Sequence, residues 1–212
     1  MKIVFDVDDT LVKRAYSGLP YQLRAHLEAV SILSGKKAQI DFETAGLTDR
    51  LIIDRVLKKI GVKIDLDKVL RMGEEIYKKK YFKMDIKAKI EGVEKFLNYL
   101  TRRKHELYLL TGNLESIAEM RLKRVNLWKY FSGGVFGDVF HSSRQDLGRL
   151  FLEKYGKPDW YFGDSIHDIA TAKAMNCKIA CITTKMPRDK LMSKGVDLIF
   201  DNYLDRKLYK IF

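Results

Sequence analysis

The first dozen residues constrain the fold more than any other stretch of the chain. Ile3, Val4 and Phe5 form an unbroken apolar run, which is typical of a strand buried on both faces of a sheet. The run ends directly in acidic residues, with Asp6 and Asp8 two positions apart. Side chains two apart in an extended chain point to the same side, so we expect these two carboxylates to project together.

Such a pair of carboxylates is unfavourable unless a cation or a shared proton compensates the charge. In open α/β sheets, ligands bind at the carboxyl ends of the strands, which is where the pair would lie. The pattern therefore indicates a functional site at the tip of the first strand. The alternative is that Asp8, Asp9 and Thr10 form only a polar turn.

The stretch after this strand has the apolar spacing of helices. Ile53, Val56, Leu57 and Ile60 recur at i, i+3, i+4 and i+7, and Gly61 is a typical helix end. The same spacing continues to about residue 77. We expect no strand between positions 13 and 87, so the pattern predicts a helical insert of about seventy residues.

From residue 90 onward, predicted helices alternate with buried strands, which indicates a parallel sheet covered on both faces. The sequence predicts an irregular, glycine-rich segment over 133–140 and a terminal helix over 202–212. The predicted strands span residues 106–111, 159–162, 178–183 and 197–200. The predicted fold class is therefore α/β, with a Rossmann-like parallel sheet.

The net charge of +12 allows either nucleic-acid binding or attraction of small anions. Most basic residues alternate with acids on helices, as on solvated faces, so we do not favour nucleic acid, although a denser run begins at Lys78. The sequence has no apolar run long enough for a membrane span. No basic leader precedes the first strand, and Cys177 and Cys181 lack a zinc or redox spacing, which together favour a cytoplasmic protein.

Two further predicted strands also end in polar residues. One ends in Thr111-Gly112-Asn113 and the other in Gly163-Asp164, and in a parallel sheet these ends share one edge with Asp6. Asp168 lies one helical turn beyond Asp164. These acids make an oxygen-rich pocket suited to Mg²⁺. Asp168 also fits a helix cap after Ser165, and both roles remain open.

These three motifs, in this order and covering nearly the whole chain, resemble the haloacid dehalogenase superfamily. The resemblance implies a core of residues 1–13 and 87–212, with residues 14–86 as an inserted α-helical cap domain. The stretch Gly46-Leu47-Thr48-Asp49-Arg50 is similar to the cap of the phosphoglycolate phosphatase-like branch.

The resemblance also implies a role for each motif residue. Asp6 would be the nucleophile that forms a phosphoaspartate. Asp8 would be the general acid and then the general base, and would offer its backbone carbonyl to the metal. Thr111, with Gly112 and Asn113, would bind the phosphoryl group, although Thr111 could also be only a β-branched strand end. The implied metal residues are Asp6, Asp8, Asp164 and Asp168.

The chain departs from the family pattern where a lysine usually precedes the third motif. The region 141–146 contains no lysine, and Arg144 is its best-placed cation. Lys154 and Lys157 are the other candidates, but Lys157 lies only seven residues before Asp164, which predicts a position at the opposite edge of the sheet. We therefore assign Arg144 to this catalytic role.

The predicted cap would contact substrate through Thr48, Asp49 and Arg50, and Arg50 could pair with a substrate carboxylate or second phosphate. In the alternative, Thr48 only caps a helix. A cap of this size favours a small phosphorylated substrate.

The resulting prediction is a Mg²⁺-dependent phosphatase, monomeric or homodimeric. A sugar phosphomutase using the same aspartates and a non-catalytic nucleic-acid-binding protein remain the alternatives.

Overall fold

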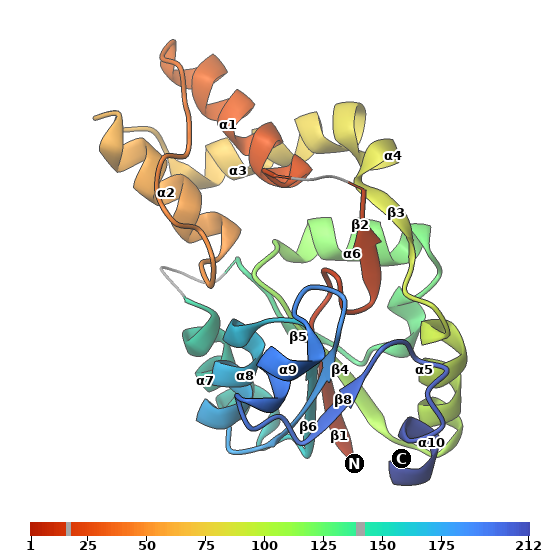
Figure 1. The fold of residues 1–212 in the computed structure, drawn as a ribbon. Coiled ribbons are helices and arrows are strands. Elements are labelled where there is room, and N and C mark those ends of the chain that lie inside the picture. The colour runs from red at the N-terminus through yellow and green to blue at the C-terminus, as the bar shows by residue number, and fades with distance from the viewer. Residues whose placement is uncertain (16–17, 139–142) are drawn as a thin grey trace.

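A parallel sheet forms the centre of the molecule in the computed structural model, which describes residues 1–15, 18–138 and 143–212. Within these residues the sheet has six strands in the order β5-β4-β1-β6-β7-β8 (Figure 1). They are β1 (Lys2–Phe5), β4 (Glu106–Leu110), β5 (Gly134–Val135), β6 (Trp160–Gly163), β7 (Lys178–Ile182) and β8 (Leu198–Phe200). Every neighbouring pair is parallel, which confirms the predicted α/β class.

Strand β1 lies in the interior of this sheet because its residues are apolar on both faces. Ile3, Val4 and Phe5 are completely buried. Ile3 and Phe5 pack into one hydrophobic cluster and Val4 into another, as the two-residue period of a strand requires. The opening run of the sequence is therefore the strand about which the core is built.

Helices cover both faces of the sheet (Figure 1). The cluster around Phe5 is completed by α5, α6 and α10, and the cluster around Val4 by α7, α8 and α9. The bounds are α5 (Val93–Arg102), α6 (Glu115–Arg124), the 3₁₀ turn η2 (Trp128–Tyr130), α7 (Arg144–Tyr155), α8 (Ile166–Ala174), α9 (Arg188–Met192) and α10 (Leu208–Ile211). The predicted alternation of strands and helices is confirmed.

A helical region lies between β2 and β3 and forms a cap above the sheet (Figure 1). It has its own hydrophobic cluster, which also includes Leu114 and Ile117 at the start of the core helix α6. Gly61 adopts a positive φ of 65° just after α2, as expected for a helix end. The elements are α1 (Tyr21–Ser34), α2 (Asp49–Lys59), α3 (Leu66–Ile76), the π-helical segment η1 (Tyr77–Tyr81) and α4 (Phe82–Asp85).

The chain enters and leaves the cap through a two-stranded antiparallel ribbon, formed by β2 (Val12–Arg14) and β3 (Ile86–Lys89). The expectation of no strand between positions 13 and 87 is therefore wrong at both ends of the insert. The two strands are three and four residues long, too short to show a clear two-residue period in the sequence.

The predicted terminal helix over 202–212 is also wrong for most of its length, because only Leu208–Ile211 is helical. The side chains of Asn202 and Asp205 accept hydrogen bonds from backbone N–H groups two residues later, at 2.9 Å each. Such local bonds favour turns over a continuous helix.

The predicted irregular segment 133–140 holds the short strand β5, while its last two residues lie outside the described part of the chain. Positions 141 and 142 of the region proposed to replace the family lysine are outside it too. Within the described residues, no helix has the length and apolar character that a membrane crossing requires.

Candidate active site

The three predicted motifs meet because their strands are neighbours in the sheet. Strand β1 pairs in parallel with β4 on one side and with β6 on the other. Asp6, Thr111 and Asp164 each follow directly or within one residue the carboxyl end of its strand. The strand order alone therefore brings these side chains to one edge, which is where ligands bind in open α/β sheets.

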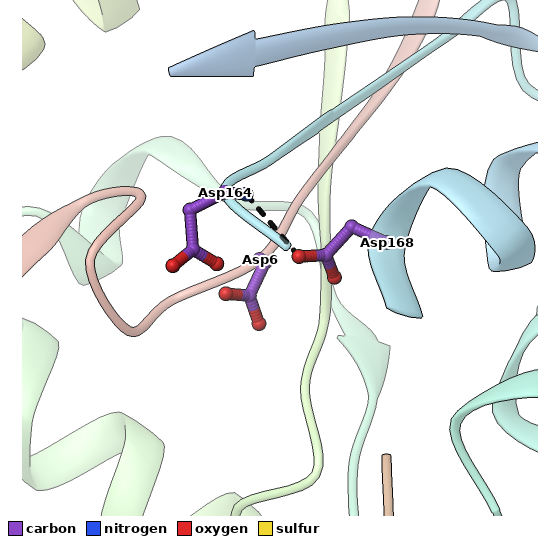
Figure 2. A group of neighbouring side chains, drawn as sticks. All are labelled: Asp6, Asp164 and Asp168. Carbon is purple, nitrogen blue, oxygen red and sulfur yellow. Dashed lines mark hydrogen bonds between the residues drawn. The ribbon is translucent and has the colours of Figure 1, made fainter. Parts of the chain in front are cut away.

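Asp6, Asp164 and Asp168 form a buried acidic group at this edge (Figure 2). One carboxylate oxygen of each lies within 4.8 Å of the others. Burial, opposed by Arg144 and reinforced by Asp168 and Asp8, raises the pKa of Asp6. Burial together with Asp168 and Asp6 also raises the pKa of Asp164 well above its usual range. Ionisation of all three acids at once is therefore unfavourable unless a further cation is bound.

Asp168 is the acid of this group with the most complete set of hydrogen-bond donors. Its Oδ2 accepts from Ser165 Oγ at 2.6 Å and from the backbone N–H groups of Ser165 and Asp164, at 3.0 and 3.2 Å. Its Oδ1 accepts from Arg144 at 3.0 Å and from the Tyr161 hydroxyl at 3.1 Å. Although burial opposes it, these contacts lower the pKa of Asp168. The predicted helix cap is present, with Ser165 and Asp168 bonded reciprocally.

Asp164 has the opposite environment. Within the described residues, no group donates a hydrogen bond to its carboxylate, although the residue is only 4% exposed and lies close to Asp6 and Asp168. The charge of Lys185 opposes the rise in the pKa of Asp164 but is outweighed. A buried carboxylate without hydrogen-bond donors is costly, and a hard divalent cation would stabilise its ionised form. The residues present therefore fit a metal held mainly by Asp6 and Asp164, with Asp168 engaged elsewhere.

Arg144 reaches into the acidic group from the first turn of α7. Its Nη2 lies 2.5 Å from Asp6 Oδ1 and 3.0 Å from Asp168 Oδ1. The turn is fixed by a capping box between Ser143 and Asp146. Lys157 lies instead beside the amino-terminal ends of β6 and β7, in a pocket that also contains Asp159.

Asp8 lines the same cavity as Asp6 but has partners of its own. Arg121 Nη2 lies 2.5 Å from Asp8 Oδ1, and Arg121 Nη1 lies 3.2 Å from Oδ2. Asn113 Nδ2 donates to Oδ2 at 2.8 Å. Burial acts to raise the pKa of Asp8, but Arg121, Arg14 and Asn113 outweigh it and lower this pKa to about 2. Asp8 is therefore ionised in this arrangement.

Arg121 is a site residue that sequence reasoning missed. It is completely buried, and its Nε lies 2.9 Å from Asp85 Oδ2, at the end of the cap. Asp85 also accepts a hydrogen bond from the hydroxyl of Tyr77. Asn113 is tied to the cap in turn, because Gln22 Nε2 donates to its Oδ1 at 2.8 Å. Both partners of Asp8 thus contact cap residues, Arg121 through an ion pair and Asn113 through a hydrogen bond.

The loop before α2 closes the cap onto the core. Gly46 accepts a hydrogen bond from the backbone N–H of Arg144 at 2.9 Å, and Asp49 donates its N–H to Gly112 at 3.0 Å. Gly46 has a φ of +76°, and a Cβ there would lie 2.6 Å from His167 Nδ1. Only glycine fits this close contact without displacing His167.

The three predicted cap residues have different positions. Thr48 caps α2, since its side chain accepts from the N–H of Leu51 at 3.3 Å. Asp49 lines the cavity with Asp6. Arg50 lies outside the cavity lining, with its Nη1 2.6 Å from Asp67 on α3. Of these three predicted residues, Asp49 is the one that lines the cavity.

The resulting cavity has a volume of about 150 Å³ and lies between the strand ends and the cap loop. Besides Asp6, Asp8 and Asp164, its charged lining includes Lys185, which sequence reasoning did not single out. Thr111, Gly112 and Asn113 line it as well, and the Thr111 hydroxyl accepts from the N–H of Asn113 at 3.3 Å. Residues of all three motifs thus line the same cavity, although Asp168 is not among them.

A Rossmann-like sheet with a helical cap and an acidic group beside an arginine at its strand ends defines an enzyme that works at that edge. The chain belongs to the haloacid dehalogenase-like hydrolase family, whose model matches residues 3–182. It is therefore a hydrolase, and the predicted family is confirmed. No match was found among curated proteins.

Several solved structures share the fold at low sequence identity. CbbY from Rhodobacter sphaeroides, in complex with phosphate, has a TM-score of 0.71 and 18% identity, covering 96% of this chain and 95% of its own. A predicted phosphoglycolate phosphatase from Haemophilus somnus 129PT has a TM-score of 0.65 and 18% identity, covering 98% and 96%. A β-phosphoglucomutase candidate from Thermotoga maritima has a TM-score of 0.62 and 21% identity, covering 100% and 99%.

Proposed function

We propose that this protein hydrolyses a small phosphate monoester with the help of Mg²⁺, through a phosphoaspartate on Asp6. The observation that carries the proposal is the position of Asp6, which follows the central strand and faces a cavity beside Asp164 and Arg144. Asp164 supplies a carboxylate without hydrogen-bond donors among the described residues, and Arg144 a fixed positive charge. Membership of a hydrolase family supports this reading.

In the first proposed step, a carboxylate oxygen of Asp6 attacks phosphorus while the bond to the leaving oxygen breaks. The leaving oxygen takes a proton from Asp8 and departs as an alcohol. In the second step, Asp8 takes a proton from water, which attacks the phosphoaspartate, releases inorganic phosphate and regenerates Asp6. The ionised Asp8 beside Arg121 suits the second step, and to act as an acid it must first gain a proton.

The proposed metal residues are Asp6, Asp164, the backbone carbonyl of Asp8 and, least directly, Asp168. When bound, Mg²⁺ supplies the positive charge that lets an anionic nucleophile approach an anionic phosphoryl group. Arg144 contributes a second fixed charge on the same side, where its Nη2 orients Asp6.

The proposed substrate contacts come from both parts of the molecule. Thr111, Gly112 and Asn113 would bind the phosphoryl group from the core, and Thr48, Asp49 and Arg50 would act from the cap. We propose residues 14–86 as the cap domain and residues 1–13 with 87–212 as the core. The cavity of about 150 Å³ favours a small metabolite, as in the phosphoglycolate phosphatase-like branch. We further propose that the protein is cytoplasmic and is a monomer or a homodimer.

The proposal is tested with p-nitrophenyl phosphate and a panel of small phosphate esters, with and without Mg²⁺. We expect Mg²⁺-dependent release of phosphate, and a loss of at least about 1,000-fold in kcat for Asp6→Asn, which removes the nucleophile. Asp41→Asn is the matched control, because Asp41 is a cap carboxylate paired with Lys59 on the surface. Isomerised product without phosphate release would indicate a phosphomutase, and RNA binding without hydrolysis would contradict the proposal.

A further inference from the structure

Asp49 is a buried carboxyl group on the cap side of the cavity. The residue is 5% exposed and lines the same space as Asp6 and Thr111. Its Oδ2 is buried, and no residue in the described part of the chain donates a hydrogen bond to it. A buried acceptor without a donor costs free energy, so this oxygen is a position where a ligand has something to contribute.

The position of this carboxyl is fixed by the backbone. The N–H of Asp49 bonds to the carbonyl of Gly112 in the phosphate-binding loop, at 3.0 Å. Asp49 is also the first residue of α2, directly after its cap Thr48. The carboxyl group therefore faces the cavity as a defined acceptor in the closed arrangement of the cap.

The surrounding charges do not neutralise Asp49. Burial raises its pKa to about 8, and the charges of Asp8, Asp138 and Asp85 add to this rise. Arg121 opposes the rise, but it is already paired with two other acids. Its Nη2 lies 2.5 Å from Asp8 Oδ1 and its Nε lies 2.9 Å from Asp85 Oδ2. An anionic ligand group placed here would meet further acidic groups, whereas a hydroxyl or ammonium group would find an acceptor.

We propose that Asp49 makes the enzyme prefer phosphate monoesters with a hydrogen-bond donor near the phosphate, a hydroxyl or an ammonium group, over esters with a second anionic group. The inference rests on the proposed phosphatase function and specifies its substrate class. It predicts another substrate class than pairing of Arg50 with a substrate carboxylate or second phosphate would, and the probes below distinguish the two. It also makes phosphoglycolate a poor substrate.

The experiment compares kcat/KM for four probes that differ beside the phosphate. Glycerol 1-phosphate carries hydroxyls, ethanolamine phosphate an ammonium group, phosphoglycolate a carboxylate, and propyl phosphate none of these. We expect the wild-type protein to prefer a donor-bearing probe, and the two donor probes show whether a hydroxyl or an ammonium group is recognised. Asp49→Leu, similar in size, should reduce the preference for that probe over propyl phosphate by about ten- to a hundredfold.

Asp49→Asn keeps an acceptor but cannot ionise, whereas the Asp49 carboxyl is ionised above its pKa of about 8. At pH 9 the variant should therefore have a higher kcat/KM for phosphoglycolate relative to glycerol 1-phosphate than the wild type. Asp41→Asn is the control. It should change neither the preference for the donor-bearing probe over propyl phosphate nor the ratio of kcat/KM for phosphoglycolate to that for glycerol 1-phosphate. Thermal unfolding of each variant shows whether it is folded. Unchanged ratios in folded Asp49 variants would overturn the inference while leaving the phosphatase function intact.

Calorimetric binding to the Asp6→Asn protein with Mg²⁺ separates the two proposals. We expect the donor-bearing probe to bind more tightly than phosphoglycolate, and the additional Asp49→Leu change to reduce the difference. Equal binding in both proteins would overturn the role of Asp49, even if no probe were hydrolysed. Absence of hydrolysis of every probe, and of p-nitrophenyl phosphate, would overturn the phosphatase function instead.

Discussion

Arg121 holds the carboxylate of Asp8 through two hydrogen bonds, with donor–acceptor distances of 2.5 and 3.2 Å. The same guanidinium lies 2.9 Å from Asp85 at the end of the cap. A buried arginine thus connects the proposed acid–base residue with the junction between the cap and the core. The arrangement explains why Asp8 is ionised, and it makes Arg121 the first residue to test for stability.

Arg121→Met is expected to reduce the free energy of unfolding by about 3–5 kcal/mol, because it leaves Asp85 buried without its cation. Urea denaturation measures the loss. Lys123→Met on the same helix is the control, since its pair with Glu119 is exposed and contributes about 1 kcal/mol or less. Equal losses for the two variants would contradict the structural role of Arg121.

Arg144→Ala is expected to lower kcat/KM by about 100-fold or more, because it removes the fixed charge that contacts Asp6 at 2.5 Å. Arg144→Lys should retain part of this activity. Lys157→Ala should stay within about twofold of wild type, since Lys157 lies at the other end of the strands. If Lys157→Ala abolished turnover and Arg144→Ala did not, the assignment of Arg144 would be wrong.

Mg²⁺ affinity is expected to increase as the pH rises from 6 to 8. Burial raises the pKa of Asp6 and, together with Asp168 and Asp6, the pKa of Asp164, so protons occupy these carboxyls at the lower pH. A metal binds their ionised forms and displaces the protons. Calorimetry in buffers of different ionisation enthalpy measures both affinity and proton release, with Asp164→Asn as the control. Binding that is independent of pH and releases no protons would rule out this linkage.

His26 is expected to make stability depend on pH between about 4 and 6.5. The ring is completely buried between α1 and α3, where a Cβ on Gly73 would lie 1.9 Å from Nδ1, and burial lowers its pKa to about 4. Below pH 6.5 the unfolded chain binds a proton that the native state rejects, so stability falls as the pH falls. The full effect is about 3 kcal/mol.

Urea denaturation at pH 4.5 and 7.5 measures this effect in wild type and in His26→Gln. The variant should lose less stability on acidification than wild type, because the other acidic and basic groups are common to both. The same loss in both proteins would show that His26 does not carry the pH dependence.

The strands that position the site were predictable because their residues are apolar on both faces. Phe5, Leu110 and Phe162 are the last apolar residues of these strands, and a parallel sheet requires the carboxyl ends to share an edge. The ribbon between cap and core was not predictable, since its strands are too short to show a period. Asn202 and Asp205 ended the last predicted helix through local side-chain bonds that helical spacing does not reveal.

The partners of Asp8 were the main part of the site that sequence reasoning missed, although a signal existed. Leu114, Ile117, Ala118 and Arg121 follow one another at helical spacing, so Arg121 stands on the apolar face of α6. A charged residue on such a face needs a buried partner. Which acid pairs with Arg121 depends on how the cap packs against the core. That packing depends on contacts between residues far apart in the sequence.

The ribbon of β2 and β3 has a consequence for how such enzymes diversify. Arg14 faces Ile86 across it, so the two crossings of the chain between core and cap lie side by side. A short hairpin turn could reconnect the chain there, and a different helical module could be spliced in at the same point. The central sheet would keep its register in such an exchange. Recombination at this ribbon could therefore alter the range of substrates, while the catalytic groups at the strand ends are inherited unchanged.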